Sequence, residues 1–371
     1  MLKIELATTQ NKSPVYLHPG ILKLTGQMLK RSFTPCPVLL VTDKNTWRYY
    51  GEICKRSLLE ENYLPFVAVL EGGEKVKTLQ SAYKLYGFAL RKGLDRKSLV
   101  VALGGGVIGD LAGFVASTYM RGIPLVQVPT TLLAMVDSSV GGKVAVNHPL
   151  GKNIIGSFYQ PARVLIDPGT LKTLPHREFS AGLAELIKYG IIMDRNFFLQ
   201  FERLSNNKLI KLKNDQRLLK FLAKAVLLKG KVVTLDEKEE GLRKILNFGH
   251  TFAHALEAAT SYTYYLHGEA VALGMIAATR LATRLKMIEE EAAGRILTLL
   301  SCLNPPPPPP DLTMGSVLDA LQADKKKVGK ELIFILPIAI GRAVTYMAPP
   351  VEDVTAVINE YLSIPLKARK G

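Results

Sequence analysis

Short apolar runs rich in β-branched residues alternate with amphipathic stretches through the first half of the chain. The runs cover residues 37–43, 64–70, 98–106, 123–131 and 163–168. Runs of this length are typical of buried strands, and the stretches between them, such as LQSAYKLYGFALRKG, have the apolar spacing of helices. This alternation predicts a parallel sheet with helices on its faces.

The spacing of the apolar residues changes near residue 178. REFSAGLAELIKYGIIM, FLAKAVLLKGKVV, ILNFGHTFAHALEAAT and GEAVALGMIAATRLATRL repeat with a period of about 3.6 residues, which predicts helices. The six prolines at 305–310 can join neither a helix nor a sheet, and we expect a polyproline II connector on the surface. The pattern therefore predicts two domains, 1–177 and 178–371.

The composition is that of a globular enzyme with an excess of positive charge. The 371 residues include 48 Lys and Arg against 32 Asp and Glu, a net charge of +16. Such an excess attracts nucleic acid, acidic membranes or phosphorylated small molecules. The densest basic stretch, around residues 208–231, alternates lysine with leucine at helical spacing, which favours a solvated helix face over a nucleic-acid site. We therefore expect a small anionic ligand rather than nucleic acid or a membrane.

The cysteines and the N-terminus indicate a cytoplasmic protein. The three cysteines have no CxxC spacing, so a disulfide framework is not expected. The first ten residues, MLKIELATTQ, lack the pattern of a signal peptide, and no apolar run has the length of a membrane span.

Three of the six histidines lie close together in the second half: His250, His254 and His267. Histidine is the commonest metal ligand and an acid or base near neutral pH. Spacing alone favours His250 and His254 as joint ligands, because residues four apart share one helix face, with His267 as a rival. The motif HExxH is absent, which argues against a zinc protease.

Glu185 lies in an otherwise apolar predicted helix, with Lys188 three residues later. One interpretation is a salt bridge between the two side chains. The other is a buried carboxylate that faces a metal ion.

Two features of the first half could bind a nucleotide. GGGVIGD, residues 104–110, lies between a predicted strand and a predicted helix, where glycines let a phosphate approach the helix N-terminus. It does not match GxGxxG, and an ordinary tight turn is the alternative. Asp43 ends a predicted strand, where its carboxylate could hold a ribose hydroxyl or cap a helix.

Two further segments combine cations with other polar groups. The loop-rich segment 129–153 could bind a polyhydroxy acid that carries a phosphate, or it could be an ordinary surface loop. Lysines 325–327 precede an apolar run and could clamp a phosphate, although a solvated turn is the usual explanation. The polar residues of the first segment are Thr130, Thr131, Asp137, Lys143, Lys152 and Asn153.

Taken in order, these segments resemble the 3-dehydroquinate synthase family. The resemblance runs from Asp43 to about Gly341 and includes VTDKN, EGGEKVK, GGGVIGDLAGFVASTYMRG, VPTTLLAMVDSSVGGKVAVNHPLGKN, LPHREFSAGLAELIKYG, DEKEEGLRKILNFGHTFAHALE, LHGEAVALGM and DKK. It implies an α/β, Rossmann-like NAD-binding N-terminal domain and a mainly α-helical, metal-binding C-terminal domain, with the active site between them.

The resemblance implies zinc or cobalt bound by Glu185, His250 and His267, and makes His254 a substrate-contacting or proton-transferring residue. It also implies a set of residues around NAD+. These are Asp43, Glu74, Lys77, Gly104, Gly105, Gly106, Asp110, Thr130, Thr131, Asp137, Lys143 and Lys152.

The implied reaction converts 3-deoxy-D-arabino-heptulosonate 7-phosphate to 3-dehydroquinate and phosphate, in the shikimate pathway. Its steps are transient oxidation by NAD+, phosphate elimination, re-reduction and intramolecular aldol closure. The family is expected to form homodimers. The implied catalytic residues are Lys143, Asn153, Lys188, Arg243, Asn247 and His254, and the implied phosphate- or carboxylate-binding residues are Arg121, Lys229, Lys325 and Lys326.

Some positions depart from the family pattern. Ala253 stands where glycine is expected, and Met135 stands where glutamine is common. KGKVV at 229–233 is a looser version of the usual lysine-containing stretch, and the six prolines resemble a private insertion.

Three alternatives remain at this point. Another sugar phosphate cyclase would use the same metal and NAD on a different sugar, but several cations and amides favour a substrate with a carboxylate. A metal-dependent polyol dehydrogenase would exchange NADH with solvent. A non-catalytic protein that binds nucleic acid is disfavoured by the set of Glu185, His250 and His267.

Overall fold

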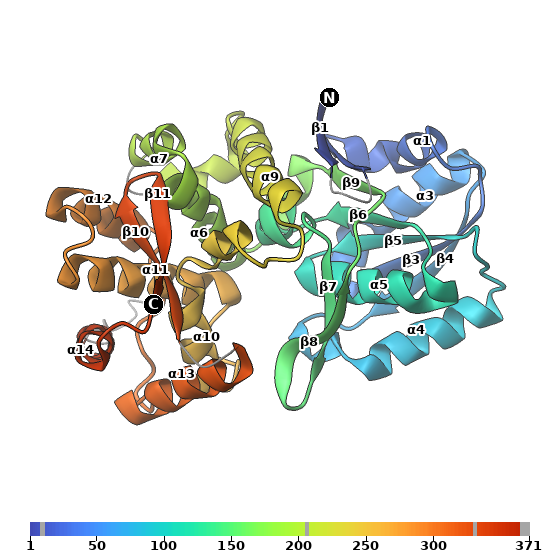
Figure 1. The fold of residues 1–371 in the computed structure, drawn as a ribbon. Coiled ribbons are helices and arrows are strands. Elements are labelled where there is room, and N and C mark those ends of the chain that lie inside the picture. Colours follow the sequence, from blue (N-terminus) through green and yellow to red (C-terminus); the bar gives the residue numbers. More distant parts are fainter. Residues whose placement is uncertain (8–11, 205–207, 329–331, 364–371) are drawn as a thin grey trace. The chain divides into compact units, whose positions relative to one another are not determined.

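The structure is a computed structural model that describes residues 1–7, 12–204, 208–328 and 332–363 (Figure 1). The chain divides into two compact units: Met1–Pro175 with Lys213–Lys238, and His176–Leu212 with Glu239–Gly371. Lys213–Lys238 thus groups with the first unit although it follows residue 178. The boundary between 177 and 178 stays a prediction.

A seven-stranded sheet in the order β1-β2-β9-β6-β5-β3-β4 organises the first unit. All neighbours pair in parallel except β1 and β2, which are antiparallel. The five predicted strands and the parallel sheet are confirmed, whereas β1 and β2 were not predicted. The strands are β1(Leu2–Ala7), β2(Lys12–Leu17), β3(Pro37–Asp43), β4(Leu64–Leu70), β5(Leu99–Gly104), β6(Leu125–Pro129) and β9(Arg163–Ile166).

Helices cover both faces of this sheet (Figure 1). Alternate residues of β3 face opposite sides: Val38 and Leu40 pack in one buried cluster, and Leu39 and Val41 in the other. Strands buried on both faces read as continuous apolar runs, which explains why the sequence pattern located them. The longer helices are α1(Thr25–Lys30) and α3(Glu52–Glu60) on one face, and α4(Leu79–Arg91) and α5(Gly106–Thr118) on the other.

Short helical segments connect these elements. Two of them, η2 and η5, are π-helical. In chain order they are η1(Ile21–Leu24), α2(Lys44–Thr46), η2(Trp47–Gly51), η3(Glu74–Val76), η4(Tyr119–Arg121), η5(Ala134–Ser138), η6(Pro168–Thr173), η7(Leu212–Asn214) and η8(Leu242–Asn247).

The segment 129–153, which was expected to be loop-rich, contains an unexpected hairpin. β7(Lys143–His148) pairs antiparallel with β8(Gly151–Phe158). Val144 and Val146 are buried, and β7 packs against α5, where a Cβ on Gly113 would lie 2.4 Å from Val144 Cγ1. The buried positions of β7 alternate with more exposed ones, and this period of two is what a strand with one buried face requires.

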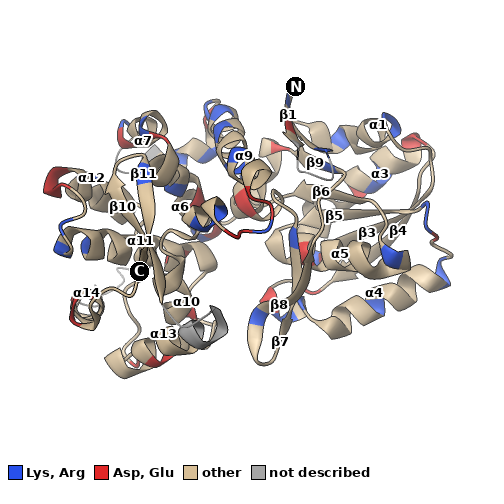
Figure 2. Cartoon of the chain, in the orientation of Figure 1, with Lys and Arg blue, Asp and Glu red and all other residues tan. Residues whose placement is uncertain are grey.

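The basic stretch around 208–231 forms mainly α9(Leu218–Leu235), which packs against β1 and η5. Lysines and arginines recur along this helix (Figure 2). Lys220 and Lys231 are exposed, as expected for a solvated helix face, but Lys229 is buried with 6% of its surface exposed.

The second unit is mainly helical, as predicted, and α11 is its centre. α11 packs against α6, α10, α12 and α14 and against the hairpin formed by β10 and β11, which was not predicted. No helix in the described part of the chain is long and apolar enough to cross a membrane. The elements are α6(His176–Met193), α7(Arg195–Glu202), α8(Lys208–Lys211), α10(His250–Ala259), α11(His267–Arg284), α12(Glu290–Ser301), α13(Met314–Val328), β10(Ile333–Ala339), β11(Arg342–Met347) and α14(Val351–Leu362).

The six prolines form neither helix nor strand, as predicted, but they do not all lie on the surface. Pro308 and Pro309 are buried. The hydroxyl groups of Tyr264 and Tyr265 donate hydrogen bonds to the carbonyl oxygen of Pro307, at 3.2 and 3.4 Å. The expected surface position is therefore wrong for part of the run, which packs against the loop that leads into α11.

Candidate functional site

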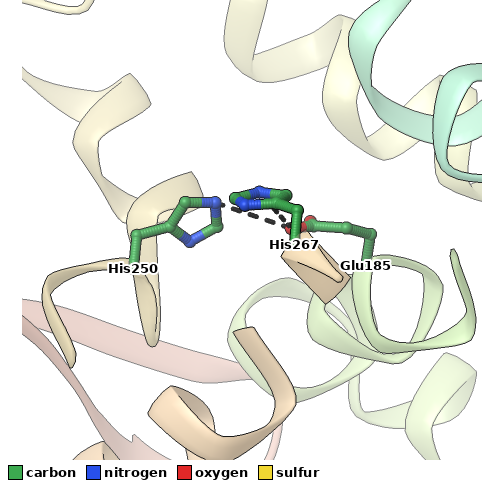
Figure 3. Close-up of side chains that lie close together, drawn as sticks. All are labelled: Glu185, His250 and His267. Atoms are coloured by element: carbon green, nitrogen blue, oxygen red, sulfur yellow. Dashed lines mark ion pairs between the residues drawn. The ribbon is translucent and has the colours of Figure 1, made fainter. Parts of the chain in front are cut away.

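Glu185, His250 and His267 converge from three helices of the second unit, α6, α10 and α11 (Figure 3). One ligand atom from each lies within 4.8 Å of the others. Nε2 of His250 is 3.5 Å from Oε1 of Glu185, and Nε2 of His267 is 4.0 Å from the same oxygen. Two imidazoles and one carboxylate are a ligand set typical of a catalytic zinc ion, with a further position for water or substrate.

The carboxylate of Glu185 is fully buried, and its two oxygens have different surroundings. Its side chain has 0% of its surface exposed, and within the described structure neither of its oxygens accepts a hydrogen bond. Oε2 forms an ion pair with Nζ of Lys188, which is also buried. The salt bridge and the buried carboxylate, which the sequence left as alternatives, therefore coexist. Oε1 faces the two histidines and, within the described residues, accepts no hydrogen bond, so a divalent ion beside Oε1 fits this site.

The surroundings of His250 favour the neutral imidazole that a metal ligand requires. Burial lowers the pKa of His250 well below its usual value, and the positive charge of Lys188 acts in the same direction. Its Nδ1 lies 3.2 Å from the carbonyl oxygen of Phe248, so a proton on Nδ1 leaves the Nε2 lone pair directed at Glu185. A neutral imidazole is the form that binds metal.

His254 lies beside the three residues without joining them. Its ring centroid is 5.7 Å from that of His250 and 6.4 Å from that of His267, and its side chain is exposed. Among the described residues, the group with metal-binding spacing contains His267 instead of His254. The geometry therefore favours His267, from another helix, over His254 as the partner of His250.

Glycines let the three ligand-bearing helices approach closely. A Cβ on Gly268, next to His267, would lie 1.9 Å from the carbonyl oxygen of Ala181 on α6. A Cβ on Gly274 would lie 2.0 Å from the carbonyl oxygen of Gly249, which precedes His250. No real side chain tolerates such distances, so α11 meets its two neighbours backbone to backbone.

The N-termini of α6 and α11 are joined by an ion pair that the sequence analysis missed. Arg177 donates from Nε and Nη2 to the two carboxylate oxygens of Glu269, at 2.6 and 2.8 Å. Oε2 of Glu269 also accepts from the backbone N–H of Leu266 at 2.8 Å, which caps α11. One sequence signal could have revealed this contact: Glu269 stands three positions after Leu266, which is the spacing of a capping box.

The remaining candidates of the second unit lie on η8 or outside the described part. Arg243 is buried with 2% of its surface exposed, and Nδ2 of Asn247 donates to Oε1 of Glu239 at 2.6 Å. The side chains of Lys325 and Lys326, near the end of α13, lie outside the described residues.

In the first unit, the glycine turn between β5 and α5 has the shape of a phosphate site. No side chain caps the first turn of α5 in the described structure. Cβ atoms on Gly105 and Gly106 would lie 3.0 Å from the side chains of Thr131 and Ser138, respectively. Side chains at these glycines would therefore crowd the turn and screen the unpaired N–H groups, whereas glycines leave them open to an anion. Gly104 ends β5, and its carbonyl oxygen accepts from the backbone N–H of Thr130 at 2.9 Å.

A polar cluster connects η3, α5 and the hairpin β7–β8. Nζ of Lys77 lies 2.5 Å from both Oδ2 of Asp110 and Oδ1 of Asn153. Asn147 holds the two sides together: its Nδ2 donates to Oε1 of Glu74 at 2.7 Å, and its Oδ1 accepts from the backbone N–H of Asn153 at 3.0 Å. The structure thus brings four predicted residues together, with Asn147 as a fifth that the sequence analysis missed.

A second charged pair joins η5 to α9. Nζ of Lys229 donates to Oδ1 of Asp137 at 2.6 Å and to its backbone carbonyl oxygen at 2.7 Å. Lys143 begins β7 and is exposed, and Lys152 on β8 is half-buried. These three lysines therefore differ in environment: Lys229 is buried against the carboxylate of Asp137, Lys152 is half-buried and Lys143 is exposed.

Asp43 lies at the same edge of the sheet as the glycine turn, because β3 and β5 pair in parallel with Thr42 opposite Leu103. Asp43 ends β3 and caps α2, where it accepts from the backbone N–H groups of Asn45 and Thr46 at 3.0 and 3.1 Å. Of the two roles that the sequence suggested for Asp43, a ribose contact and a helix cap, this is the helix cap.

Arg121, in contrast, lies at the other end of α5. Arg121 is exposed after the C-terminal end of α5, roughly 20 Å along that helix from the glycine turn at 1.5 Å per residue. Its phosphate-binding role stays a prediction.

Comparisons with known proteins agree with this arrangement. A family profile described as 3-dehydroquinate synthase N-terminal matches residues 67–181, and one described as 3-dehydroquinate synthase C-terminal matches residues 182–327. The chain is 46% identical over 349 residues to a 3-dehydroquinate synthase from Desulforamulus reducens, covering 94% of this chain and 96% of the relative.

Two solved structures of cyclases are also similar. One is 2-epi-5-epi-valiolone synthase from Streptomyces hygroscopicus subsp. jinggangensis with NAD+ and Zn2+ bound, with TM-score 0.87, 28% identity, and coverage of 96% of this chain and 98% of that chain. The other is 2-deoxy-scyllo-inosose synthase complexed with carbaglucose-6-phosphate, NAD+ and Co2+, with TM-score 0.86, 27% identity, and coverage of 97% and 100%. Because both family profiles match in order and a relative of nearly equal length shares almost half of its residues, the chain belongs to the 3-dehydroquinate synthase family.

Proposed function

We propose that this chain converts 3-deoxy-D-arabino-heptulosonate 7-phosphate to 3-dehydroquinate and phosphate, as a carbon–oxygen lyase that depends on NAD+ and a divalent metal ion. The observation that carries the proposal is the convergence of Glu185, His250 and His267 in a chain of this family. The NAD+ and the Zn2+ or Co2+ in the two similar cyclases support the choice of cofactors.

Glu185, His250 and His267 would hold the metal ion. When bound, a divalent ion supplies Lewis-acid polarisation of a substrate hydroxyl. Lys188 offsets the charge of Glu185 through its ion pair with Oε2 and leaves Oε1 on the side of the two histidines. His254 is exposed beside the ligands, where its imidazole is suited to carry a proton to and from the substrate.

The first unit would hold NAD+. When bound, the nicotinamide supplies a reversible hydride acceptor, so that turnover leaves no net NADH. The open first turn of α5 would bind a phosphate, and Asp43, at the carboxyl end of β3, would accept a hydrogen bond from a ribose hydroxyl. The other residues that we propose for NAD+ binding are Glu74, Lys77, Gly104, Gly105, Gly106, Asp110, Thr130, Thr131, Asp137, Lys143 and Lys152.

Cationic and amide side chains would bind the carboxylate, phosphate and hydroxyl groups of the substrate. We assign this role to a set drawn from both units. Several of these side chains are already oriented by the hydrogen bonds described above, as Asn153 is by Lys77 and Asn247 is by Glu239. The set is Lys143, Asn153, Lys188, Arg243, Asn247 and His254, with Arg121, Lys229, Lys325 and Lys326 for the phosphate or carboxylate.

A sister cyclase that acts on another sugar phosphate is the main competing function. The two similar cyclase structures are 28% and 27% identical to this chain, whereas the 3-dehydroquinate synthase from Desulforamulus reducens is 46% identical. The higher identity to a 3-dehydroquinate synthase supports 3-deoxy-D-arabino-heptulosonate 7-phosphate, which carries a carboxylate, as the substrate. The homodimer and the cytoplasmic location implied by the family stay predictions.

Phosphate release from 3-deoxy-D-arabino-heptulosonate 7-phosphate tests the proposal. We expect release with NAD+ and zinc, loss of release after chelation and restoration by added zinc, with 3-dehydroquinate as product and no accumulation of NADH. Net NADH would indicate a dehydrogenase. A folded, zinc-loaded sample that releases phosphate only from a different sugar phosphate would indicate a sister cyclase and contradict the proposed substrate.

A further inference from the structure

Glu257 is a buried carboxylate beside one of the proposed metal ligands. It lies on α10, seven residues after His250, so that His250, His254 and Glu257 follow one face of the helix at positions i, i+4 and i+7. Only 4% of its surface is exposed. Its Oε2 lies 3.4 Å from Nδ1 of His267, which begins the next helix.

The two histidines of the site share one arrangement. In His250, Nδ1 faces the carbonyl oxygen of Phe248 and Nε2 faces Oε1 of Glu185. In His267, Nδ1 faces the carboxylate of Glu257 and Nε2 faces the same oxygen of Glu185. Each imidazole therefore has an acceptor at one nitrogen and the proposed metal position at the other.

We infer that Glu257 is a positioning residue for the metal centre: it accepts the Nδ1 proton of His267 and thereby presents the Nε2 lone pair to the ion. The inference rests on the proposed metal site. A hydrogen bond from the distal nitrogen fixes the tautomer and the ring orientation of a ligating histidine, and a carboxylate acceptor also makes the ligating nitrogen more basic.

The orientation of His267 should depend more on Glu257 than the orientation of His250 depends on Phe248. The Phe248 acceptor is a backbone carbonyl group that no substitution removes, and His250 is also held by burial, with 13% of its side chain exposed. The His267 side chain is 34% exposed, so packing restrains its ring less. His267 therefore depends more on a side-chain acceptor for its orientation.

Zinc affinity of the purified full-length chain is the direct test. Competition with a chromophoric chelator would measure the dissociation constant for wild type, Glu257→Gln, Glu257→Asp and Glu257→Ala, without substrate or NAD+. We expect Glu257→Gln and Glu257→Ala to weaken zinc binding by roughly 10–100-fold, and Glu257→Asp to lie between them and wild type because it keeps the charge. Glu202→Gln is the matched control, since Glu202 pairs with Arg295 on the surface of the same unit.

A second readout separates positioning from packing. In metal-free protein labelled with 15N at histidine, the neutral His267 ring should carry its proton on Nδ1 in the wild type and show a mixture of tautomers in Glu257→Gln. A packing role would lower the urea midpoint of the metal-free variant and leave its zinc affinity within about twofold of wild type, which would overturn the inference. Glutamine has nearly the same volume as glutamate. A change in the zinc affinity of Glu257→Gln therefore reports the loss of the negative charge and not a change in packing volume.

The wild type separates this inference from the proposed function. If wild type binds zinc, His250→Ala does not, and Glu257→Gln binds as wild type does, the metal site stands and the role of Glu257 is wrong. If wild type binds neither zinc nor cobalt, both the metal site and the inference fail.

Discussion

Gly268 lies directly against the backbone of Ala181, where an added Cβ would be 1.9 Å from the carbonyl oxygen of Ala181. Gly268 follows the proposed ligand His267, and Ala181 precedes the proposed ligand Glu185 by four residues on α6. The contact therefore sets the distance between the helices that carry two of the three ligands.

Gly268→Ala should both destabilise the second unit and weaken metal binding. The added methyl group must displace α11 from α6, and overpacking of this kind costs about 1–3 kcal/mol. The same displacement separates His267 from Glu185. Urea unfolding of the metal-free chain and zinc titration would measure the two effects.

Gly294→Ala is the control for this substitution. A Cβ at Gly294, in the middle of α12, meets nothing within 4 Å. Alanine favours a helix interior over glycine by up to about 1 kcal/mol, so this variant should be as stable as wild type or more so. Equal behaviour of the two variants would show that the close approach at Gly268 does not matter.

His250→Ala should lose the metal ion, whereas His254→Ala should keep it and lose turnover. His250 belongs to the group with metal-binding spacing and His254 does not. Metal content after dialysis and phosphate release would be measured for both. Loss of zinc from His254→Ala with retention in His250→Ala would reverse the assignment and restore the ligand choice suggested by spacing.

Asn147→Ala should weaken NAD+ binding, although Asn147 is not among the residues that we propose to contact the cofactor. Its side chain joins Glu74 to the backbone of Asn153, and both neighbours belong to proposed binding sets. Removal takes away the part-buried hydrogen bond to Glu74 and the exposed one to Asn153, at a cost of about 1 kcal/mol, or roughly 5-fold in affinity if expressed in binding. Isothermal titration with NAD+ would measure it, with the exposed Asn214→Ala as control; unchanged affinity would exclude this positioning role.

Lys143→Ala should abolish turnover and leave the fold intact. Lys143 is exposed at the start of β7, so its removal leaves no cavity. Circular dichroism should match wild type while phosphate release falls to background. Lys220→Ala, which removes an exposed lysine from α9, should keep full activity; a Lys143→Ala enzyme that is equally active would remove Lys143 from the proposed catalytic set.

Tyr265→Phe should destabilise the second unit by about 1–3 kcal/mol, because the buried hydroxyl group of Tyr361 loses its contact with Tyr265. The hydroxyl group of Tyr265 lies 2.5 Å from that of Tyr361 on α14 and donates to the carbonyl oxygen of Pro307 at 3.4 Å. Burial raises the pKa of both phenols. Chemical unfolding would measure the loss, and Tyr83→Phe, with Tyr83 74% exposed, should have no effect.

The local sequence pattern determined those helices and strands in which apolar residues form a continuous run or repeat at helical spacing. The strands of the parallel sheet are apolar on both faces, and α6, α10 and α11 repeat at helical spacing, so neighbouring residues along the chain decided their structure. The pattern did not reveal the hairpins β7–β8 and β10–β11, whose strands are stabilised by partners that local spacing does not specify. The ordered motifs were enough to identify the family and its three proposed ligands.

Only the tertiary structure decided how these residues meet. Spacing favoured His254 as the second ligand because it shares a helix face with His250, but the partners of His250 come from α6 and α11, and glycine contacts at Gly249 and Gly268 set their distances. Glu257 and Asn147 stayed unnoticed for the same reason, since each acts on a residue of another element. A single sequence records which side chains are present and which share a helix face, whereas contacts between elements arise from packing, where small differences in backbone separation decide which atoms lie within reach.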